Sequence, residues 1–168
     1  GMLNLVSALE HSVKEFPQKD AIVFGDKKFT YAQVNAMANQ VANGLTALGI
    51  GKGDKVALSC PNLPFFPMVY YGILKTGAVV VPLNVLLKGR EITYHLQDSE
   101  AKAYFCFQGT PELPMAEEGW AGFNGADQCE HFWVMTADPS SASPIEGTAT
   151  LGQLIGSQSP VFETAVTQ

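Results

Sequence analysis

The stretch Asp54–Asn84, DKVALSCPNLPFFPMVYYGILKTGAVVVPLN, decides the fold of this chain. It opens with Lys55–Ser59, a short apolar run closed by a nearby proline, which predicts a buried strand. Leu63–Lys75 is long and apolar and ends just before a glycine, which predicts a helix. Ala78–Val81 is rich in β-branched residues and predicts a second strand. Strand, helix and strand in this order form a βαβ unit, which requires parallel pairing and a right-handed crossover.

Helices and strands are also predicted on both sides of this unit. Thr30–Gln33 has the pattern of a capping box, and the apolar stripe behind it predicts a helix that ends at Gly49. An amphipathic helix is expected to begin with Asn4 as its N-cap and to stop at Pro17. The remaining expected elements are a hairpin of Ala21–Phe24 and Lys27–Thr30, strands at Lys102–Phe107 and Glu130–Met135, short helices at Arg90–Gln97 and Thr150–Ile155, and one or two helical turns within Leu113–Trp120.

Short apolar strands that alternate with helices predict an α/β fold, with a mainly parallel sheet covered by helices on both faces. The sheet is small, and we expect it to be part of a larger one. Residues 1–168 are expected to form a single domain. Gly1 is interpreted as a cloning scar. Residues 157–168 show no periodicity and no apparent packing partner, and are expected to form a flexible tail.

Composition excludes several classes of function. The net charge is −6, and Arg90 is the single arginine among ten basic residues, so the chain lacks the dense basic stripe that nucleic acids require. No apolar run approaches the roughly 20 residues of a membrane span, and we interpret the N-terminus as lacking a signal peptide. Cys60, Cys106 and Cys129 are widely spaced and without a CxxC pair. They predict core thiols in a reducing compartment, and hence a cytoplasmic protein.

Two glycine patterns could suggest nucleotide binding. Gly44–Ile50 has the glycine spacing of a phosphate loop, but an isoleucine stands where the lysine is needed. Gly49–Gly53 has the spacing that begins a dinucleotide fingerprint. Both patterns lie between a helix and the strand that follows it, whereas a phosphate site needs a strand followed by a helix N-terminus. We therefore interpret them as a helix stop and a turn.

The search for catalytic groups also assigns no residue. His11, His95 and His131 lack a second ligand at metal-site spacing and are interpreted as solvated or core residues. Glu117 and Glu118 are adjacent, so their side chains diverge, and a solvated loop is expected there. No GxSxG elbow occurs. The aromatic residues Phe65, Phe66, Tyr70, Tyr71, Tyr104, Phe105 and Phe107 are expected in the core. The sequence therefore predicts no catalytic, cofactor-binding or metal-binding residue.

Several spaced blocks of the sequence resemble the opening blocks of the acyl-adenylate-forming (AMP-binding) enzymes, and most of all the fatty-acid and related carboxylate–CoA ligases, or acyl-CoA synthetases. The resemblance covers about Leu3–Phe107 and is specific because the blocks stand in the same order. They are Thr30–Val34 (TYAQV), Leu48–Ala57 (LGIGKGDKVA), Pro61–Pro64 (PNLP), Leu74–Asn84 (LKTGAVVVPLN) and Glu91–Leu96 (EITYHL).

The resemblance implies the fold of an acetyl-CoA synthetase-like large domain, of which this chain would be an incomplete N-terminal portion. It implies that the parent enzyme converts a carboxylate and ATP to an acyl-adenylate and then transfers the acyl group to CoA, with Mg²⁺ as the metal. The family's Ser/Thr/Gly/Lys-rich phosphate loop, downstream acidic residue and C-terminal lysine find no match here. Phe162–Ala165 resembles the lead-in to that loop. The chain alone is therefore expected to be inactive and to bind none of these cofactors.

Two residues depart from the family's pattern. Phe65 stands where an acidic residue is common, and Pro67 where an aliphatic residue is usual. Because a proline inside the first turn opposes helix formation, the helix after Pro64 is expected to begin two or three residues late.

Two hypotheses follow for the function of the chain. In the first, it is a scaffold piece of an ATP-dependent ligase, whose partner is the remainder of the parent enzyme. An apolar face left exposed by the absent part would then favour homodimers. In the second, it is a stand-alone binding or dimerisation module that keeps the fold without the chemistry, because an α/β domain of 168 residues can fold alone.

Overall fold

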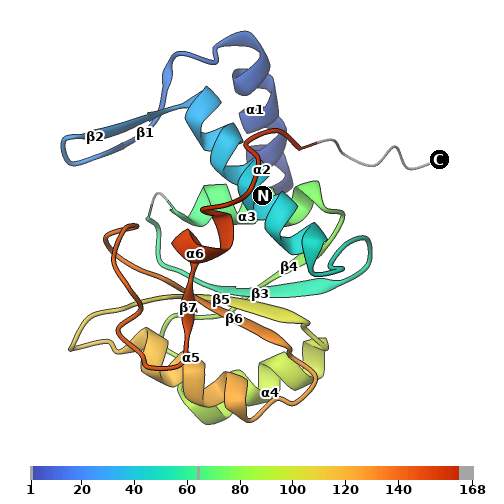
Figure 1. Cartoon of the computed structure of the whole chain (residues 1–168), viewed down its shortest axis with the longest axis vertical. Helices are drawn as coiled ribbons and strands as arrows, with labels where there is room; N and C mark the ends of the chain where they lie inside the picture. The colour runs from blue at the N-terminus through green and yellow to red at the C-terminus, as the bar shows by residue number, and fades with distance from the viewer. Residues whose placement is uncertain (1, 64, 163–168) are drawn as a thin grey trace.

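Five parallel strands form the central sheet of the computed structural model, which describes residues 2–63 and 65–162 (Figure 1). Their order is β4-β3-β5-β6-β7, and every neighbouring pair is parallel. The strands are β3 (Lys55–Ser59), β4 (Val79–Pro82), β5 (Ala103–Phe107), β6 (His131–Met135) and β7 (Ala149–Thr150). The four strands expected from the sequence are confirmed. The two-residue strand β7 is an addition that the sequence did not predict.

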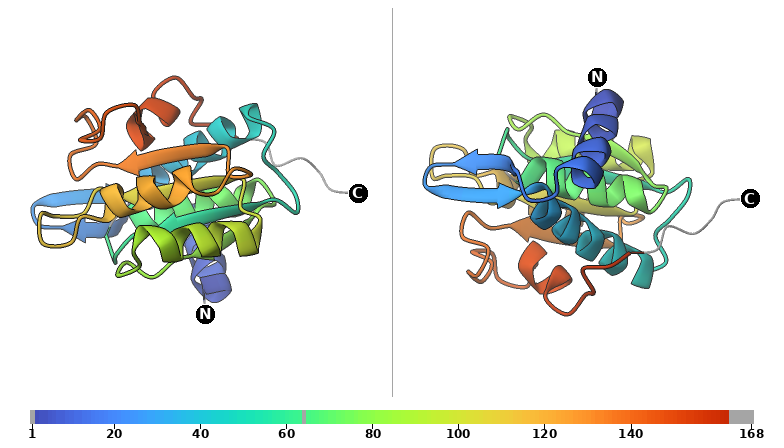
Figure 2. Two further views of the ribbon diagram at one scale, coloured as in Figure 1. Left: turned by 90° about the horizontal axis from the view of Figure 1, so that it is seen from below. Right: turned by 90° about the horizontal axis from the view of Figure 1, so that it is seen from above.

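Helices cover both faces of this sheet, as predicted for an α/β protein (Figure 1, Figure 2). On one side lie α1 (Met2–Glu15), α2 (Tyr31–Ala47), α3 (Phe65–Lys75) and α6 (Leu151–Ile155), with α1 packed on α2. On the other side lie α4 (Gly89–Ser99) and α5 (Met115–Asn124), which contact each other. The chain therefore forms three layers: helices, sheet and helices.

Successive side chains of each strand point to opposite faces of the sheet, so each face has its own apolar core. In β3, Val56 and Leu58 pack among residues of α2 and α3, whereas the intervening Ala57 packs with residues of α4 and α5. In β5, Phe105 points to the first core and stacks on Trp133 of β6, with ring centroids 4.7 Å apart. Both cores are closed by helices, so the central strands are buried on both faces, as the apolar runs predicted.

The βαβ unit that decides the fold is β3-α3-β4. The helix begins at Phe65, directly after Pro64, so the delay of two or three residues expected from Pro67 is wrong. Pro67 is the third residue of α3, where the missing N–H would have no intrahelical acceptor, so the proline costs little there. Gly77 follows the helix with a φ of +86°, the left-handed geometry that lets the chain turn directly into β4.

The capping box of α2 is confirmed. Thr30 Oγ1 accepts from the N–H of Gln33 at 3.1 Å, and the Gln33 side chain accepts from the N–H of Thr30 at 2.8 Å. The helix ends at Ala47, and Gly49 has a φ of +81°. Asp54 Oδ2 then accepts from the N–H of Gly51 at 2.9 Å and closes the turn into β3. Both glycine patterns in this region thus form a helix stop and a turn, as interpreted from the sequence.

The predicted hairpin is also present, as β1 (Asp20–Phe24) and β2 (Lys27–Thr30) joined at Gly25, whose φ is +62°. It forms a separate two-stranded sheet that projects from one end of the molecule (Figure 2). An isolated two-stranded ribbon is marginally stable in water. The stability of this ribbon therefore depends on the contacts at its base and on any surface that packs against its exposed face.

Three expectations about the ends of the elements are wrong. Asn4 is not an N-cap, because α1 begins at Met2. The helix expected within Leu113–Trp120 extends to Asn124 as α5, because its glycines allow close packing against α4 and β5. In the C-terminal part, backbone carbonyls between residues 158 and 161 accept hydrogen bonds from α2, so this segment has a packing partner. Residues 163–168 of the expected tail, including most of Phe162–Ala165, lie outside the described residues.

Candidate binding cleft at the carboxyl edge of the sheet

The order of the strands creates a switch point between β3 and β5. The chain leaves β3 for α3 on one face of the sheet, and leaves β5 for α5 on the opposite face (Figure 1). The two loops therefore diverge at the carboxyl ends of neighbouring strands. Ligands of open α/β sheets bind in the crevice that such divergence opens. This edge is accordingly the first place to look for a site.

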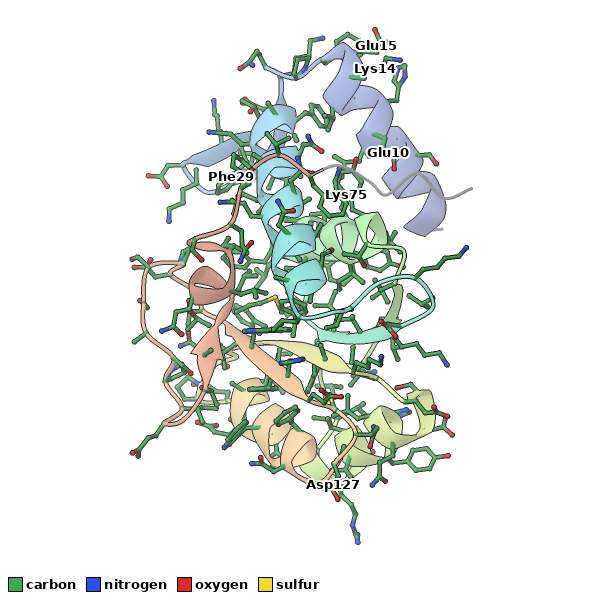
Figure 3. The ribbon with its side chains drawn as sticks, turned by 45° about the vertical axis from the view of Figure 1, so that its right-hand side comes forward. Glu10, Lys14, Glu15, Phe29, Lys75 and Asp127 are labelled. Carbon is green, nitrogen blue, oxygen red and sulfur yellow. The ribbon has the colours of Figure 1, made fainter. Side chains whose placement is uncertain are left out.

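A cleft of about 280 Å³ lies at this edge. One wall comes from the β1–β2 hairpin, and the floor comes from the end of β5 and from the segments that follow β3 and β6. Its lining residues are Gly25, Asp26, Lys27, Phe29, Leu63, Phe65, Phe107, Ala137 and Pro139 (Phe29 is labelled in Figure 3). The lining is mainly apolar, and its floor is held by the central sheet, whereas its wall belongs to the separate β1–β2 ribbon. The cleft is therefore a preformed apolar surface.

The charged groups of the cleft are Asp26 and Lys27, both exposed at the tip of the hairpin. A triphosphate needs several converging cations or backbone N–H groups, so these lining residues do not fit ATP. Among residues 2–63 and 65–162, no group of three or more His, Cys, Asp or Glu side chains is placed to hold a metal ion. The cleft can accept an apolar group, but its described residues offer no means to activate a phosphoryl group.

A buried polar pair joins β3 to β5. Ser59 Oγ and Tyr104 Oη lie 2.6 Å apart, and both side chains are almost fully buried. Burial raises the pKa of Tyr104 well above its ordinary value, so the phenol stays neutral and can donate. The hydrogen bond satisfies both hydroxyls inside an apolar core and so fixes the register of β3 against β5.

The three cysteines are free and buried, which confirms the predicted core thiols. Burial, with a smaller contribution from Cys106, raises the pKa of Cys60 to about 12. Burial also raises the pKa of Cys106 and of Cys129 to about 12. Because the thiolate is the reactive form, these thiols are poor nucleophiles near neutral pH. Their role is packing.

The histidines lie as the sequence predicted. His11 packs edge-on against Phe16 and is exposed, and His95 is exposed on α4 beside Tyr94. His131 stacks on Trp133 with a ring separation of 5.7 Å. They are far apart in the fold, on α1, α4 and β6.

The expected solvated loop at Glu117 and Glu118 is wrong. Both residues lie in the first turn of α5, where a negative charge favours the helix dipole. Glu118 Oε1 also accepts from the N–H of Gly89 at 2.9 Å, and so satisfies a free donor at the start of α4. Glu118 thus ties α4 to α5, and its role is structural.

The aromatic residues divide between core and cleft. Tyr71, Tyr104 and Phe105 are buried, as expected. Phe65 and Phe107 are only half-buried and line the cleft instead. Sequence reasoning missed this role, although a signal was available for Phe107: it ends a predicted strand, and the carboxyl ends of parallel strands meet at one edge of the sheet.

Geometry first defines the class of protein: a doubly wound parallel sheet with an apolar cleft at its switch point. Comparison with known proteins then gives the family. The sequence pattern of the AMP-binding enzymes matches residues 9–150, and the chain therefore belongs to the AMP-binding enzyme family. The acyl-adenylate-forming relationship expected from the sequence is confirmed.

Curated relatives within the family are CoA ligases and synthetases. The chain is 47% identical over 92 residues to the long-chain-fatty-acid–CoA ligase FadD13 of Mycobacterium tuberculosis, an overlap of 55% of this chain and 18% of that protein. It is 35% identical over 126 residues to the putative acyl-CoA synthetase YngI of Bacillus subtilis, which covers 66% of this chain and 23% of that protein. The chain thus spans about a fifth of the length of these relatives.

Solved structures agree with this assignment. The anthranilate CoA ligase AuaEII in complex with anthranoyl-AMP superposes with a TM-score of 0.79 at 31% identity, covering 95% of this chain and 29% of that one. The N-terminal domain of FACL13 from Mycobacterium tuberculosis superposes with a TM-score of 0.75 at 31% identity, covering 97% of this chain and 38% of that domain. The fold is therefore that of an N-terminal portion of acyl- and aryl-CoA ligases.

Within the described part of the chain, every helix is too short or too polar to cross a bilayer.

Proposed function

We propose that this chain is the N-terminal part of an ATP-dependent long-chain fatty acid–CoA ligase. Such an enzyme joins a carboxylate to the α-phosphate of ATP, releases pyrophosphate, and transfers the acyl group from the acyl-adenylate to CoA. The observation that carries this proposal is the 47% identity to FadD13 over 92 residues. The parent enzyme would use ATP, Mg²⁺ and CoA. The free thiols of Cys60, Cys106 and Cys129 support a reducing location, for which we propose the cytoplasm.

The proposed role of residues 1–168 within the enzyme is that of a scaffold. Stabilising charge on the α-phosphoryl group takes preorganised cations and N–H donors. The cleft at the switch point instead has an apolar lining, with Lys27 as the one cation among its described residues. We therefore place the phosphate loop and the catalytic lysine of the parent in its remaining part, and we propose that the isolated chain is inactive.

Pyrophosphate release tests this proposal. The purified 168-residue chain is expected to release no pyrophosphate above background with palmitate, ATP and Mg²⁺, while FadD13 in the same assay releases it readily. The natural protein, if it extends past Gln168, is expected to be active with long-chain acids. Pyrophosphate formation by the 168-residue chain, dependent on the fatty acid, would contradict the scaffold role.

We further propose that the remainder of the ligase packs over the cleft and the β1–β2 hairpin. Two observations support a contact that surrounds the hairpin: the apolar lining of the cleft, to which Phe29 contributes, and Val23, which lies on the other face of the ribbon and is 61% exposed. In the isolated chain the same surface is free, and a second copy is expected to cover it. The isolated chain should therefore form dimers.

Sedimentation velocity over a range of concentrations measures this association. Val23→Glu is expected to shift the equilibrium towards monomer, because a carboxylate would have to be desolvated in the interface. Tyr94→Glu is the matched control, since Tyr94 is 62% exposed but lies on α4, on the opposite face of the sheet. A monomer at all concentrations, or equal effects of the two variants, would refute this interface.

A further inference from the structure

Three amide side chains of α2 hold the segment that follows α6. Asn39, Gln40 and Asn43 occupy positions i, i+1 and i+4, so they lie side by side on the helix. We call them the amide row. Their NH₂ groups donate to backbone carbonyls as follows: Asn39 Nδ2 to Pro160 O at 2.8 Å, Asn43 Nδ2 to Ser159 O at 2.8 Å and to Val161 O at 2.9 Å, and Gln40 Nε2 to Gln158 O at 3.3 Å and to Ile155 O at 3.4 Å. Figure 1 shows this segment crossing α2.

Hydrogen bonds, rather than apolar burial, hold residues 159–161 of this segment. Ser159 and Pro160 are exposed, and Val161 is 69% exposed. The segment contributes no strand to the sheet within the described residues, so the amide row supplies what a neighbouring strand would otherwise supply. Because each bond is made to the main chain, the row fixes the path of the backbone whatever side chains it carries.

Asn39 is a buried polar residue whose NH₂ group donates to Pro160 O, while its own carbonyl oxygen has no described partner. The side chain is only 7% exposed, and its Oδ1 accepts no hydrogen bond from any described residue. A buried acceptor without a partner destabilises the fold. An apolar side chain of similar size would fill the same space without this penalty. The gain from asparagine at this position is therefore its bond to Pro160.

We propose that Asn39, Gln40 and Asn43 are positioning residues, which fix the backbone of residues 155–161 and thereby set where the chain enters the phosphate-binding loop. Val161 carries the last carbonyl that the row holds, and Phe162 follows it directly. Phe162–Ala165 resembles the lead-in to that loop. The last step rests on the proposed ligase function, whereas the clamping of residues 155–161 does not.

A spin label at position 161 tests the clamping in this chain. Val161→Cys can be labelled selectively, because the three natural thiols are buried with pKa values near 12. The label points to solvent, while the carbonyl of residue 161 stays available to Asn43. Asn43→Asp keeps the size of the side chain but replaces two donors by a carboxylate that faces two carbonyl oxygens. We expect the mobile fraction of the label to rise about tenfold, the effect of losing two hydrogen bonds.

Asn35→Asp is the matched control. Asn35 lies on α2 one turn before Asn39, and its side chain makes no hydrogen bond to residues 155–161. Asn35→Asp should leave the spectrum of the label unchanged. Asn35→Asp and Asn43→Asp should both melt within a few degrees of the parent by circular dichroism. An unchanged spectrum in Asn43→Asp, or an equal change in both variants, would overturn the proposal.

Kinetics of the natural ligase test the link to the phosphate loop. Asn43→Asp is expected to raise KM for ATP about tenfold and to leave KM for the fatty acid unchanged, because the triphosphate site alone would be displaced. Equal changes in both KM values, or none, would refute this link. If the parent protein has no ligase activity at all, the proposed function fails, while the spin-label result still decides whether the amide row clamps the segment.

Discussion

Replacing Gly72 with alanine is expected to lower the free energy of unfolding by about 3 kcal/mol, because α2 and α3 touch at this residue. A Cβ on Gly72 would lie 2.6 Å from Val41 Cβ, 2.7 Å from Val41 Cγ1 and 2.8 Å from Ala38 O. Val41 is β-branched and buried, and the carbonyl belongs to the backbone of α2, so neither can move aside alone. The helices would have to separate, which opens the core above β3. Urea unfolding followed by circular dichroism measures the loss.

Gly44→Ala is the matched control for this prediction. Gly44 is also a buried helical glycine, but a Cβ there would meet only the side chain of Leu154, at 2.8 Å from Cδ1 and 2.9 Å from Cγ. Leu154 belongs to the short helix α6 and is half-buried, so it can shift. Alanine also favours a helix over glycine by up to about 1 kcal/mol. The stability of Gly44→Ala should therefore stay within about 1 kcal/mol of the parent. Equal losses in the two variants would show that helix separation is not the cause.

Much of the fold could be predicted because its signals are local. The β3-α3-β4 unit carries apolar runs bounded by prolines and a glycine within one stretch of sequence, and α2 carries both halves of its capping box. Each signal is satisfied by residues a few positions apart, so tertiary contacts reinforce it without redirecting it.

Elements that depend on distant contacts could not be predicted in the same way. Gly119 and Gly122 weaken the helical pattern of α5, yet side chains of β5 and α4 fill the space beside them, and the helix runs on to Asn124. β7 has two residues, too few to show a period, and exists because Ala149 and Thr150 pair with β6. In both cases packing overrides local preference.

The same reasoning explains why the candidate site was not found in the sequence. Leu63, Phe107 and Pro139 line one cleft, but dozens of residues separate them along the chain. The amide row escaped notice for a similar reason. Asn39 and Asn43 look like ordinary polar positions of an amphipathic helix, and their partners lie more than a hundred residues later. Only the topology brings either set together.

Gly109→Ala is expected to have the largest effect of any single substitution considered, a loss of about 4 kcal/mol in the free energy of unfolding. Gly109 directly follows Gln108 at the end of β5, beside the cleft, and has a φ of +83°. A Cβ there would collide with the carbonyl oxygen of Leu113 and lie 2.5 Å from Met115 N. Both atoms are backbone. The turn closed by the hydrogen bond from the N–H of Thr110 to Leu113 O, at 2.9 Å, would have to open.

Gly53→Ala separates the two causes of this loss, which are the left-handed backbone conformation and the collision of the Cβ with backbone atoms. Gly53 has a φ of +85°, nearly the same as Gly109, but a Cβ there would meet nothing within 4 Å. Its alanine variant carries only the conformational penalty of a left-handed residue, about 1 kcal/mol. The difference between the two variants, measured by urea unfolding, is therefore the cost of the backbone collision beside the cleft. If Gly53→Ala lost as much stability as Gly109→Ala, the collision would contribute nothing, and the tight turn that leads from β5 into α5 would not depend on the missing side chain.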